Sequence, residues 1–246
     1  MIESLLRQHL AGFHASRLLD VGPGYNAFGR IAARVTGAGS VTYIDCNRDV
    51  IAWQTEECRK EGLAAEGLLF PLEPAALGAL SGHYDLILCQ EVFEHLANAE
   101  DILGGLVEHL APDGRMVVTV PTKRSEQWMK RINPNYMKND PYGHVREFDE
   151  AGLRQLLRDA GLQPLVFLPT QPHYFVAHTW FFGTRMRVEE STGKILTKGI
   201  RGFVSRKLFK LSKKLFCMTG YDRWGRLLPR NYFVVAHKVR PDGNEI

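Results

Sequence analysis

The first 122 residues alternate between short apolar segments and longer segments with helical periodicity, and this alternation constrains the fold more than any other feature. Strands are expected at residues 17–21, 40–44, 63–69, 84–89 and 115–120. Helices are expected between them, at residues 27–36, 48–61 and 98–110, and a short helix is expected at residues 1–10. Strands joined by single helices form a parallel sheet, because right-handed crossovers place helices on its faces. The sequence therefore predicts an α/β, doubly wound fold.

The second half of the chain continues this pattern less regularly. A helix at residues 149–160 ends at Gly161, a strand follows at 164–168, and a last strand is expected at 231–239. We therefore predict a mostly parallel, seven-stranded sheet with helices on both faces and a long, partly helical insertion before the last strand. The predicted regions are a core at 1–169, an insertion at 170–230, and a returning strand with a tail at 231–246.

Composition excludes several classes of protein. Of the 246 residues, 45% are hydrophobic and 24% are charged, which is typical of a packed globular domain. No segment reaches the roughly 18 uncharged apolar residues of a membrane-spanning helix, and residues 1–10 lack the apolar core of a secretory signal. The four cysteines form no CxxC pair, so reduced thiols are expected. We expect a cytoplasmic protein.

A glycine turn follows the first predicted strand, in the segment Asp20-Val21-Gly22-Pro23-Gly24-Tyr25-Asn26. Gly22 and Gly24 lack a β-carbon, so the backbone can turn sharply there and approach a ligand closely. The next strand ends at Asp45, twenty-one residues after Gly24. A carboxylate in that place can accept hydrogen bonds from a ribose diol, so the pattern favours a nucleoside ligand.

This turn resembles motif I of the class I S-adenosylmethionine-dependent methyltransferases, which has the form (D/E)xGxGxG. Asp20, Gly22 and Gly24 match the motif, and Asn26 stands where the third glycine is usual. We interpret that departure as mild, because asparagine tolerates positive φ better than most residues. The missing glycine also disfavours a dinucleotide dehydrogenase. The resemblance implies a Rossmann-like fold and binding of S-adenosylmethionine by Asp20, Gly22, Gly24 and Asp45.

Two later segments extend the resemblance through about residue 122. Residues 84–96 resemble the fourth strand of the family and the turn beyond it, and residues 110–121 resemble the approach to its fifth strand. By this resemblance, Gln90 and Glu91 lie close to the methionine end of the cofactor. Many relatives carry an acid that contacts adenine after the third strand, where this chain has Leu68, so the adenine contact stays open.

Methyl transfer requires alignment of the reactants and, for a hydroxyl acceptor, removal of a proton. His95 is the leading candidate base, because imidazole titrates near neutral pH, although it could equally be a local packing or capping residue.

Glu91, Glu94 and His95 also form an ExxEH pattern. This pattern resembles the metal-binding ExxEH of quinone-biosynthesis O-methyltransferases and of small-RNA 2′-O-methyltransferases, and His144 would match a later histidine of the second group. The predicted catalytic residues are therefore His95, Glu91 and His144. A divalent metal such as Mg²⁺ stays open, because many metal-free relatives also have an EH pair.

The insertion contains a strongly basic segment. Residues 191–221 contain eight Lys or Arg and no acid, whereas the remainder has 31 − 8 = 23 basic and 27 acidic residues. In residues 200–216, one helical face is predicted to be apolar (Ile200, Phe203, Val204, Leu208, Leu211, Leu215) and the opposite one basic (Arg206, Lys207, Lys210, Lys213, Lys214). Residues 198–216 could therefore bind an anionic membrane surface, or their apolar face could pack on the protein itself. Nucleic acid is a weaker alternative as a partner of this basic segment.

The aromatic residues between His173 and Phe182 could line an acceptor pocket, form a lid or be core.

Three functions follow from these observations. The first is O-methylation of a small-molecule, glycan or lipid-linked acceptor, in the cytoplasm or at the inner membrane surface. The second is RNA 2′-O-methylation with a metal at Glu91, Glu94, His95 and His144. The third is a binding protein that kept the cofactor fold but lost turnover.

Overall fold

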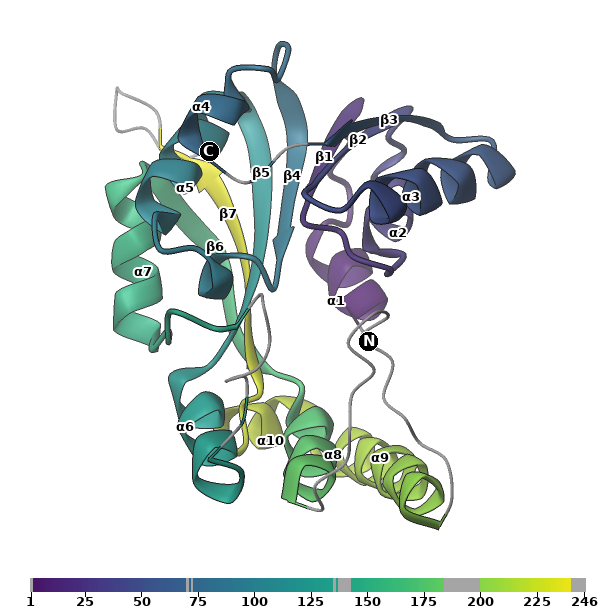
Figure 1. The fold of residues 1–246 in the computed structure, drawn as a ribbon, viewed down its shortest axis with the longest axis vertical. Coiled ribbons are helices and arrows are strands. Elements are labelled where there is room, and N and C mark those ends of the chain that lie inside the picture. Colours follow the sequence, from purple (N-terminus) through teal and green to yellow (C-terminus); the bar gives the residue numbers. More distant parts are fainter. Residues whose placement is uncertain are drawn as a thin grey trace. The chain divides into compact units, whose positions relative to one another are not determined.

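The computed structural model describes residues 2–69, 71, 73–134, 136, 143–183 and 200–239. Its centre is a seven-stranded sheet with the strand order β3-β2-β1-β4-β5-β7-β6 (Figure 1). The strands are β1 (Arg17–Val21), β2 (Ser40–Asp45), β3 (Ala64–Leu69), β4 (Tyr84–Gln90), β5 (Leu110–Pro121), β6 (Leu162–Thr170) and β7 (Asn231–Lys238). The predicted fold class is confirmed, and each strand lies within a few residues of its predicted position.

The strand order reverses next to β1. Strand β1 pairs in parallel with β2 on one side and with β4 on the other, and the pairs β2–β3 and β4–β5 are also parallel. The connections from β1 through β2 to β3 therefore advance toward one edge of the sheet, and the connection from β4 to β5 advances toward the other. Because such crossovers are right-handed, α2 (Phe28–Thr36) and α3 (Arg48–Lys60) cover one face and α5 (Ala99–Glu108) covers the other. Ligands of such sheets bind beyond the carboxyl ends of the strands at this reversal.

Burial follows the position of each strand in the sheet. Strands β1 and β4 are buried along almost their whole length, whereas the edge strand β3 alternates between exposed and half-buried residues. Near-continuous apolar strands are typical of a sheet that is covered on both faces. The helix α1 (Ile2–His9) adds Ile2 and Leu6 to the core and packs against α2. Figure 1 shows β7 running in the direction opposite to β4.

Strand β5 is longer than predicted. The prediction began it at residue 115 and placed a turn before it, but the strand begins at Leu110. The register shifts from Tyr84 opposite Leu110 to Leu86 opposite Arg115, so the supposed turn is an irregular, bulged part of the ladder. A β-carbon on Gly114 would lie 3.1 Å from the carbonyl oxygen of Asp85, which explains the glycine there.

The chain divides into two compact units. The first unit comprises residues 1–119, 151–167 and 234–246, and the second comprises residues 120–150 and 168–233. The predicted boundaries at 169/170 and 230/231 lie near two of these divisions, but residues 120–150 group with the insertion. Hydrogen bonds join this segment to the insertion: the N–H of Thr122 donates to the carbonyl of Arg230 (3.0 Å), and the indole N–H of Trp128 donates to the Thr179 hydroxyl (2.9 Å).

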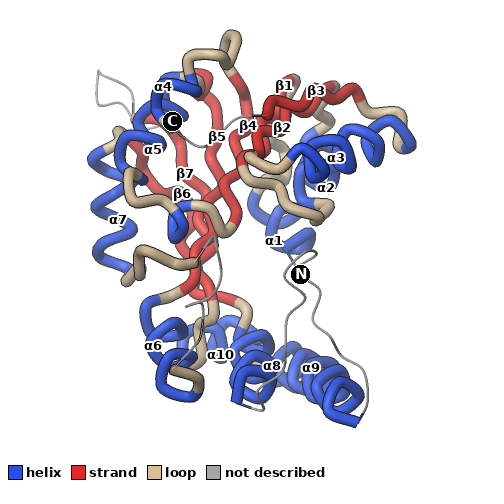
Figure 2. The backbone as a smooth tube through the Cα atoms, in the orientation of Figure 1, coloured by secondary structure: helices blue, strands red, loops and turns tan. Residues whose placement is uncertain are grey.

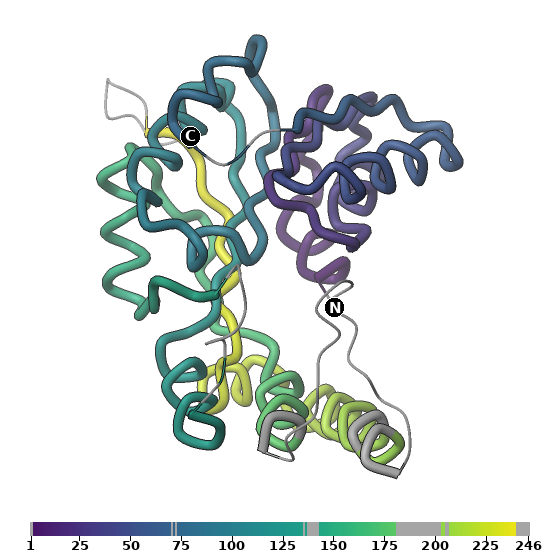
Figure 3. The backbone as a smooth tube through the Cα atoms, in the orientation of Figure 1, coloured from purple at the N-terminus to yellow at the C-terminus, as the bar shows by residue number. Residues whose placement is uncertain are grey.

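The remaining helices of the first unit include α4 (Pro74–Leu77), which packs against α5, and α7 (Glu150–Asp159), which leads into β6. The second unit is mainly helical (Figure 2). Its helices are α6 (Lys123–Ile132), α8 (Pro172–Gly183), α9 (Ile200–Thr219) and α10 (Tyr221–Leu227). Helix α8 packs against α6, α9 and α10, and Figure 3 shows that α6 precedes the other three by a long stretch of chain. Among the described helices, none has both the length and the apolarity to cross a membrane.

Candidate cofactor and catalytic site

The predicted glycine turn connects β1 to α2. Gly22 and Gly24 have positive φ angles of 61° and 52°, which side chains other than glycine rarely adopt. The N–H of Gly22 donates to the carbonyl of Ile44 (2.8 Å), so the turn is tied to the end of β2. A β-carbon on Gly24 would meet no atom within 4 Å. The backbone at Gly24 therefore faces open space, as a turn that receives a ligand must.

Asn26 is accommodated at the third glycine position of the motif for a different reason from the one that we predicted. Among the described residues, the only non-glycine residues with positive φ are Glu91 and Gln171, so the interpretation of Asn26 from positive φ was wrong. Its side chain instead forms the turn, because Oδ1 accepts from the N–H of Phe28 (2.9 Å) and Nδ2 donates to the carbonyl of Pro23. Such local hydrogen bonds are typical of asparagine before a helix.

Gln54 supports the turn from α3, and sequence reasoning missed it. Its side-chain amide donates to the carbonyls of Gly24 (2.7 Å) and Asn26 (2.8 Å), and its oxygen accepts from the buried guanidinium of Arg30 (2.7 Å). Only 1% of Gln54 is exposed. The available signal was periodicity, because Gln54 lies on the buried face of α3 between Val50 and Cys58. A polar residue on the apolar face of a helix must have a buried partner.

Asp45 ends β2 beside the glycine turn, as predicted. Its Oδ1 accepts from the N–H of Asn47 (2.8 Å), and the backbone of Gly24 also donates to its carboxyl group. Burial raises the pKa of Asp45, against the lowering effect of these hydrogen bonds. The open space at Gly24 therefore adjoins a half-buried carboxylate. This arrangement fits a ribose diol, although the assignment of Asp45 to the cofactor stays a prediction.

Asp20 is buried under the turn, with 2% of its surface exposed. Burial raises its pKa to about 8, although the backbone N–H of Gly29 donates to it. A β-carbon on Gly29 would lie 2.5 Å from Asp20 Oδ2, so only glycine lets the first turn of α2 come this close. The predicted contact of Asp20 with the cofactor is not tested. Its observed contact with the backbone of Gly29 indicates that Asp20 holds the start of α2 against the end of β1.

Gln90 and Glu91 lie where β4 ends. Gln90 is 6% exposed, and its Nε2 has no hydrogen-bond partner in the described part of the chain. A buried donor of this kind fits a ligand that supplies the acceptor. Glu91 has a strained φ of 55°, its N–H donates to the carbonyl of Thr119 (2.9 Å), and its Oε1 accepts from the Thr119 hydroxyl (3.2 Å). Strained residues of this kind concentrate at functional sites.

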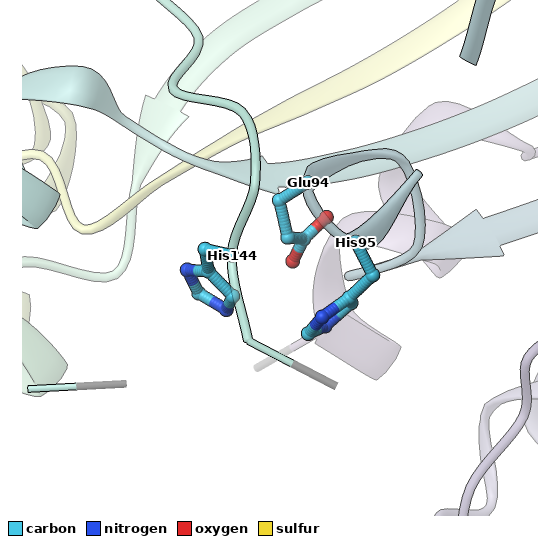
Figure 4. Close-up of side chains that lie close together, drawn as sticks. All are labelled: Glu94, His95 and His144. Carbon is cyan, nitrogen blue, oxygen red and sulfur yellow. The ribbon is translucent and has the colours of Figure 1, made fainter. Parts of the chain in front are cut away.

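Glu94 and His95 follow in a short 3-10 turn, η1 (Phe93–His95). The N–H of His95 donates to the carbonyl of Val92 (3.0 Å), which closes the turn. Glu94 is 1% exposed, whereas the His95 ring is half-buried, and Figure 4 shows that both side chains leave the same turn. His95 is therefore a titratable group held beyond the carboxyl end of β4.

His144 belongs to the second unit, where it contacts a buried carboxylate. Its Nδ1 lies 2.7 Å from Oε2 of Glu126, which is 1% exposed. Glu126 Oε1 accepts from Arg230 (3.2 Å) and from the Tyr136 hydroxyl (3.3 Å). Burial acts to raise the pKa of Glu126, but the His144 hydrogen bond and the charge of Arg230 together lower it. Sequence reasoning missed Glu126 and Arg230, because they lie 104 residues apart.

The residues predicted to hold a metal thus divide between the units. Glu91, Glu94 and His95 belong to the first unit and His144 to the second. Within this set, the Glu91 carboxylate bonds to Thr119 and the His144 ring bonds to Glu126. A metal at these residues stays a prediction.

Comparison with known proteins agrees with this geometry. A family model described as a methyltransferase domain matches residues 1–166. The ubiquinone biosynthesis O-methyltransferase of Rickettsia prowazekii is 31% identical over 114 residues, which are 46% of this chain and 43% of the relative. The protein of the same name from Rickettsia canadensis is 23% identical over 164 residues, 64% of this chain and 67% of the relative. The chain spans about half the length of most curated relatives that it matches.

Solved structures share the fold. The structure of a putative sarcosine dimethylglycine methyltransferase from Galdieria sulphuraria has a TM-score of 0.61 at 16% identity, with 96% of this chain and 84% of that chain covered. The geranyl diphosphate C-methyltransferase of Streptomyces coelicolor has a TM-score of 0.61 at 15% identity, with coverage of 97% and 78%. The chain belongs to the methyltransferase domain family, with the Rossmann-like fold of class I S-adenosylmethionine-dependent methyltransferases.

Proposed function

We propose that this protein transfers the methyl group of S-adenosylmethionine to a hydroxyl group of a small-molecule acceptor. The observation that carries the proposal is the position of His95, half-buried in the turn that follows β4, next to the strand reversal where ligands of this fold bind. The names of the relatives, ubiquinone biosynthesis O-methyltransferases, support a hydroxyl acceptor.

The first unit supplies the groups that would hold the cofactor. The open backbone at Gly24 would let the nucleoside approach, Asp45 would accept from its ribose, and Gln90 would donate to its methionine portion. S-adenosylmethionine, when bound, supplies a methyl group that is already activated on a sulfonium. The protein then has to align the acceptor, exclude water and remove one proton.

His95 would remove that proton. An imidazole accepts protons near neutral pH, so it can take the hydroxyl proton as the acceptor oxygen forms its bond to the methyl carbon. When bound, the cofactor would supply the methyl carbon and would leave as a neutral thioether that keeps the electron pair of the broken carbon–sulfur bond. Glu91 would set the direction of the turn, because its backbone and carboxylate are both tied to Thr119.

The test is transfer of labelled methyl from S-adenosylmethionine to phenolic, glycosidic and short RNA acceptors, with Mg²⁺ or with a chelator. We expect His95→Ala to lower kcat on a phenolic acceptor by about 10²- to 10⁴-fold while calorimetric affinity for S-adenosylhomocysteine is retained. His83→Ala, an exposed histidine of the first unit, is the matched control. Transfer to RNA alone, with metal dependence, would favour the 2′-O-methyltransferase. Cofactor binding without any transfer would favour the binding protein.

Helix α9 supports a second proposal, attachment to an anionic membrane surface. The predicted apolar face of α9 could bind a membrane or pack on the protein, and much of it is exposed: Phe203, Leu211 and Leu215 are 55%, 65% and 50% exposed, whereas Ser212 and Phe216 are buried. Residues 203, 207, 211, 214 and 218 follow one side of the helix, so lysines and large apolar groups share the exposed side. Residues 198 and 199 of the predicted segment lie outside the described residues.

A helix that exposes apolar groups among lysines can insert the former between lipid headgroups and pair the latter with phosphates. We expect anionic vesicles to sediment the protein at low salt, and neutral vesicles to leave it in solution. Leu211→Asp should abolish sedimentation, whereas Leu227→Asp, an exposed leucine of α10, should not. Equal retention of both variants would contradict attachment through α9.

A further inference from the structure

Helix α6 presents two arginines for which the described part of the chain offers no ionic partner. Arg124 and Arg131 form no ion pair or side-chain hydrogen bond with any residue that the structure describes. They are seven residues apart and therefore lie on one side of the helix, with Trp128 between them. Two uncompensated guanidinium groups on one surface create a positive potential, and their planar donors match phosphate oxygens.

This side of α6 borders a hollow within the second unit. The hollow has a volume of about 680 Å³, and its other walls include Phe175 of α8, Leu228 and Tyr232. That volume lies in the range of small-molecule sites, which are about 300 to 1,000 Å³. The lining thus combines aromatic and aliphatic surface with the two arginines.

The aromatic wall is held in a defined position. The Trp128 and Phe175 rings stack at 6.2 Å with an interplanar angle of 25°. The indole N–H of Trp128 donates to the Thr179 hydroxyl (2.9 Å), which fixes the ring, yet 39% of Trp128 is exposed. A fixed and accessible indole offers a flat apolar surface on which a planar ligand group can stack.

The charges of the hollow do not cancel. Lys123 lies 3.6 Å from the carboxylate of Asp149, so these two lining residues neutralise each other. Arg124 and Arg131 remain, which leaves a net charge of +2. A neutral apolar ligand would make no use of them, whereas a ligand with an anionic group would pair with them.

We propose that the hollow beside α6 binds a phosphate monoester of an aromatic group, with the ring against Trp128 and the phosphate between Arg124 and Arg131. All the lining residues belong to the second unit, so this site is distinct from the glycine turn and from Asp45. The proposal concerns binding only, and it holds whether or not this ligand is methylated.

The test is calorimetric titration of the full chain with phenyl phosphate, inorganic phosphate and phenol. We expect phenyl phosphate to bind more tightly than either of its parts. Arg124→Gln and Arg131→Gln should each weaken it about tenfold or more, because each removes a charge-assisted hydrogen bond. Trp128→Leu should weaken phenyl phosphate while leaving inorganic phosphate unchanged. Arg158→Gln, which removes an equal charge from exposed α7, is the matched control.

Two results would overturn the proposal. Equal weakening by Arg158→Gln would show that phenyl phosphate responds to overall charge rather than to the hollow. Failure of phenyl phosphate to bind, together with loss of anionic-vesicle sedimentation in the double variant of Arg124 and Arg131, would assign these arginines to lipid headgroups. Circular dichroism of each variant checks that the helices remain folded.

Discussion

The two units bury ionisable groups of opposite kinds. In the first unit, burial raises the pKa of Asp20 to about 8, so this carboxyl is mostly protonated at neutral pH. In the second unit, burial lowers the pKa of His173 to about 4, and Glu126 is kept charged by His144 and Arg230. Both units thus hold buried polar groups, but the first holds a neutral acid and the second an ionised one.

The two units also differ in the groups to which their buried polar residues bond. The polar groups around Asp20 and Gln54 bond to the backbone of the glycine turn and of α2, so they determine the path of the main chain. The group around Glu126 bonds to side chains of residues far apart in the sequence. A network of the first kind shapes a binding turn, whereas one of the second kind joins separate segments. The next three experiments test this distinction.

The largest effect is expected from Glu126→Ala in the second unit. The substitution leaves Arg230 buried without its carboxylate, and breaking a buried ion pair in this way costs about 3–5 kcal/mol. Urea denaturation would measure the free energy of unfolding. Glu147→Ala is the control, because its ion pair with Lys130 is partly exposed and is expected to contribute less than about 1 kcal/mol. If both variants lost a similar amount of unfolding free energy, the Glu126 network would contribute no more to stability than an exposed ion pair.

A smaller effect is expected from Asp45→Ala in the first unit. Loss of hydrogen bonds from a ribose diol to a carboxylate should cost about 1.5–3 kcal/mol, which is roughly 10- to 150-fold in affinity for S-adenosylhomocysteine. Calorimetry would measure it, with Asp101→Ala on the exposed side of α5 as the control. Unchanged affinity would remove Asp45 from the cofactor site. Phenyl phosphate binding should be the same in both variants, because the hollow lies in the other unit.

The smallest effect is a pH dependence that Asp20→Asn should remove. The pKa of Asp20 is raised in the folded state, so its contribution to stability is greatest at low pH and is lost as pH rises toward about 8. His173 acts in the opposite direction, because its lowered pKa removes stability as pH falls from 6.5 to about 4. Between pH 6.5 and 8 only Asp20 of these two titrates.

In that window, the free energy of unfolding of the unmodified protein should fall by up to about 1.4 kcal/mol per pH unit through Asp20. Denaturation curves at several pH values would show a flatter profile for Asp20→Asn. Parallel profiles for the two proteins would mean that the Asp20 pKa is not raised in the folded state.

Local patterns determined most of the first unit. The strands from β1 to β5 and the helices α2, α3 and α5 were predicted because each has its own apolar periodicity. The proximity of Gly24 and Asp45 was predictable for a related reason, because adjacent parallel strands end at the same edge of a sheet. Gln54 was missed, since its partners are main-chain carbonyls that carry no sequence signature.

The sequence by itself thus determined the sheet, the glycine turn and the presence of a basic helix near residues 200–216. Only the tertiary structure decided that residues 120–150 join the insertion, that Glu126 supports His144, and that α9 exposes Leu211 but buries Phe216. The physical reason is the distance along the sequence between the residues that interact. Periodicity reports interactions within a few residues. The buried side of α9, however, is set by α8, and one partner of Glu126 is Arg230, which lies just before the last strand.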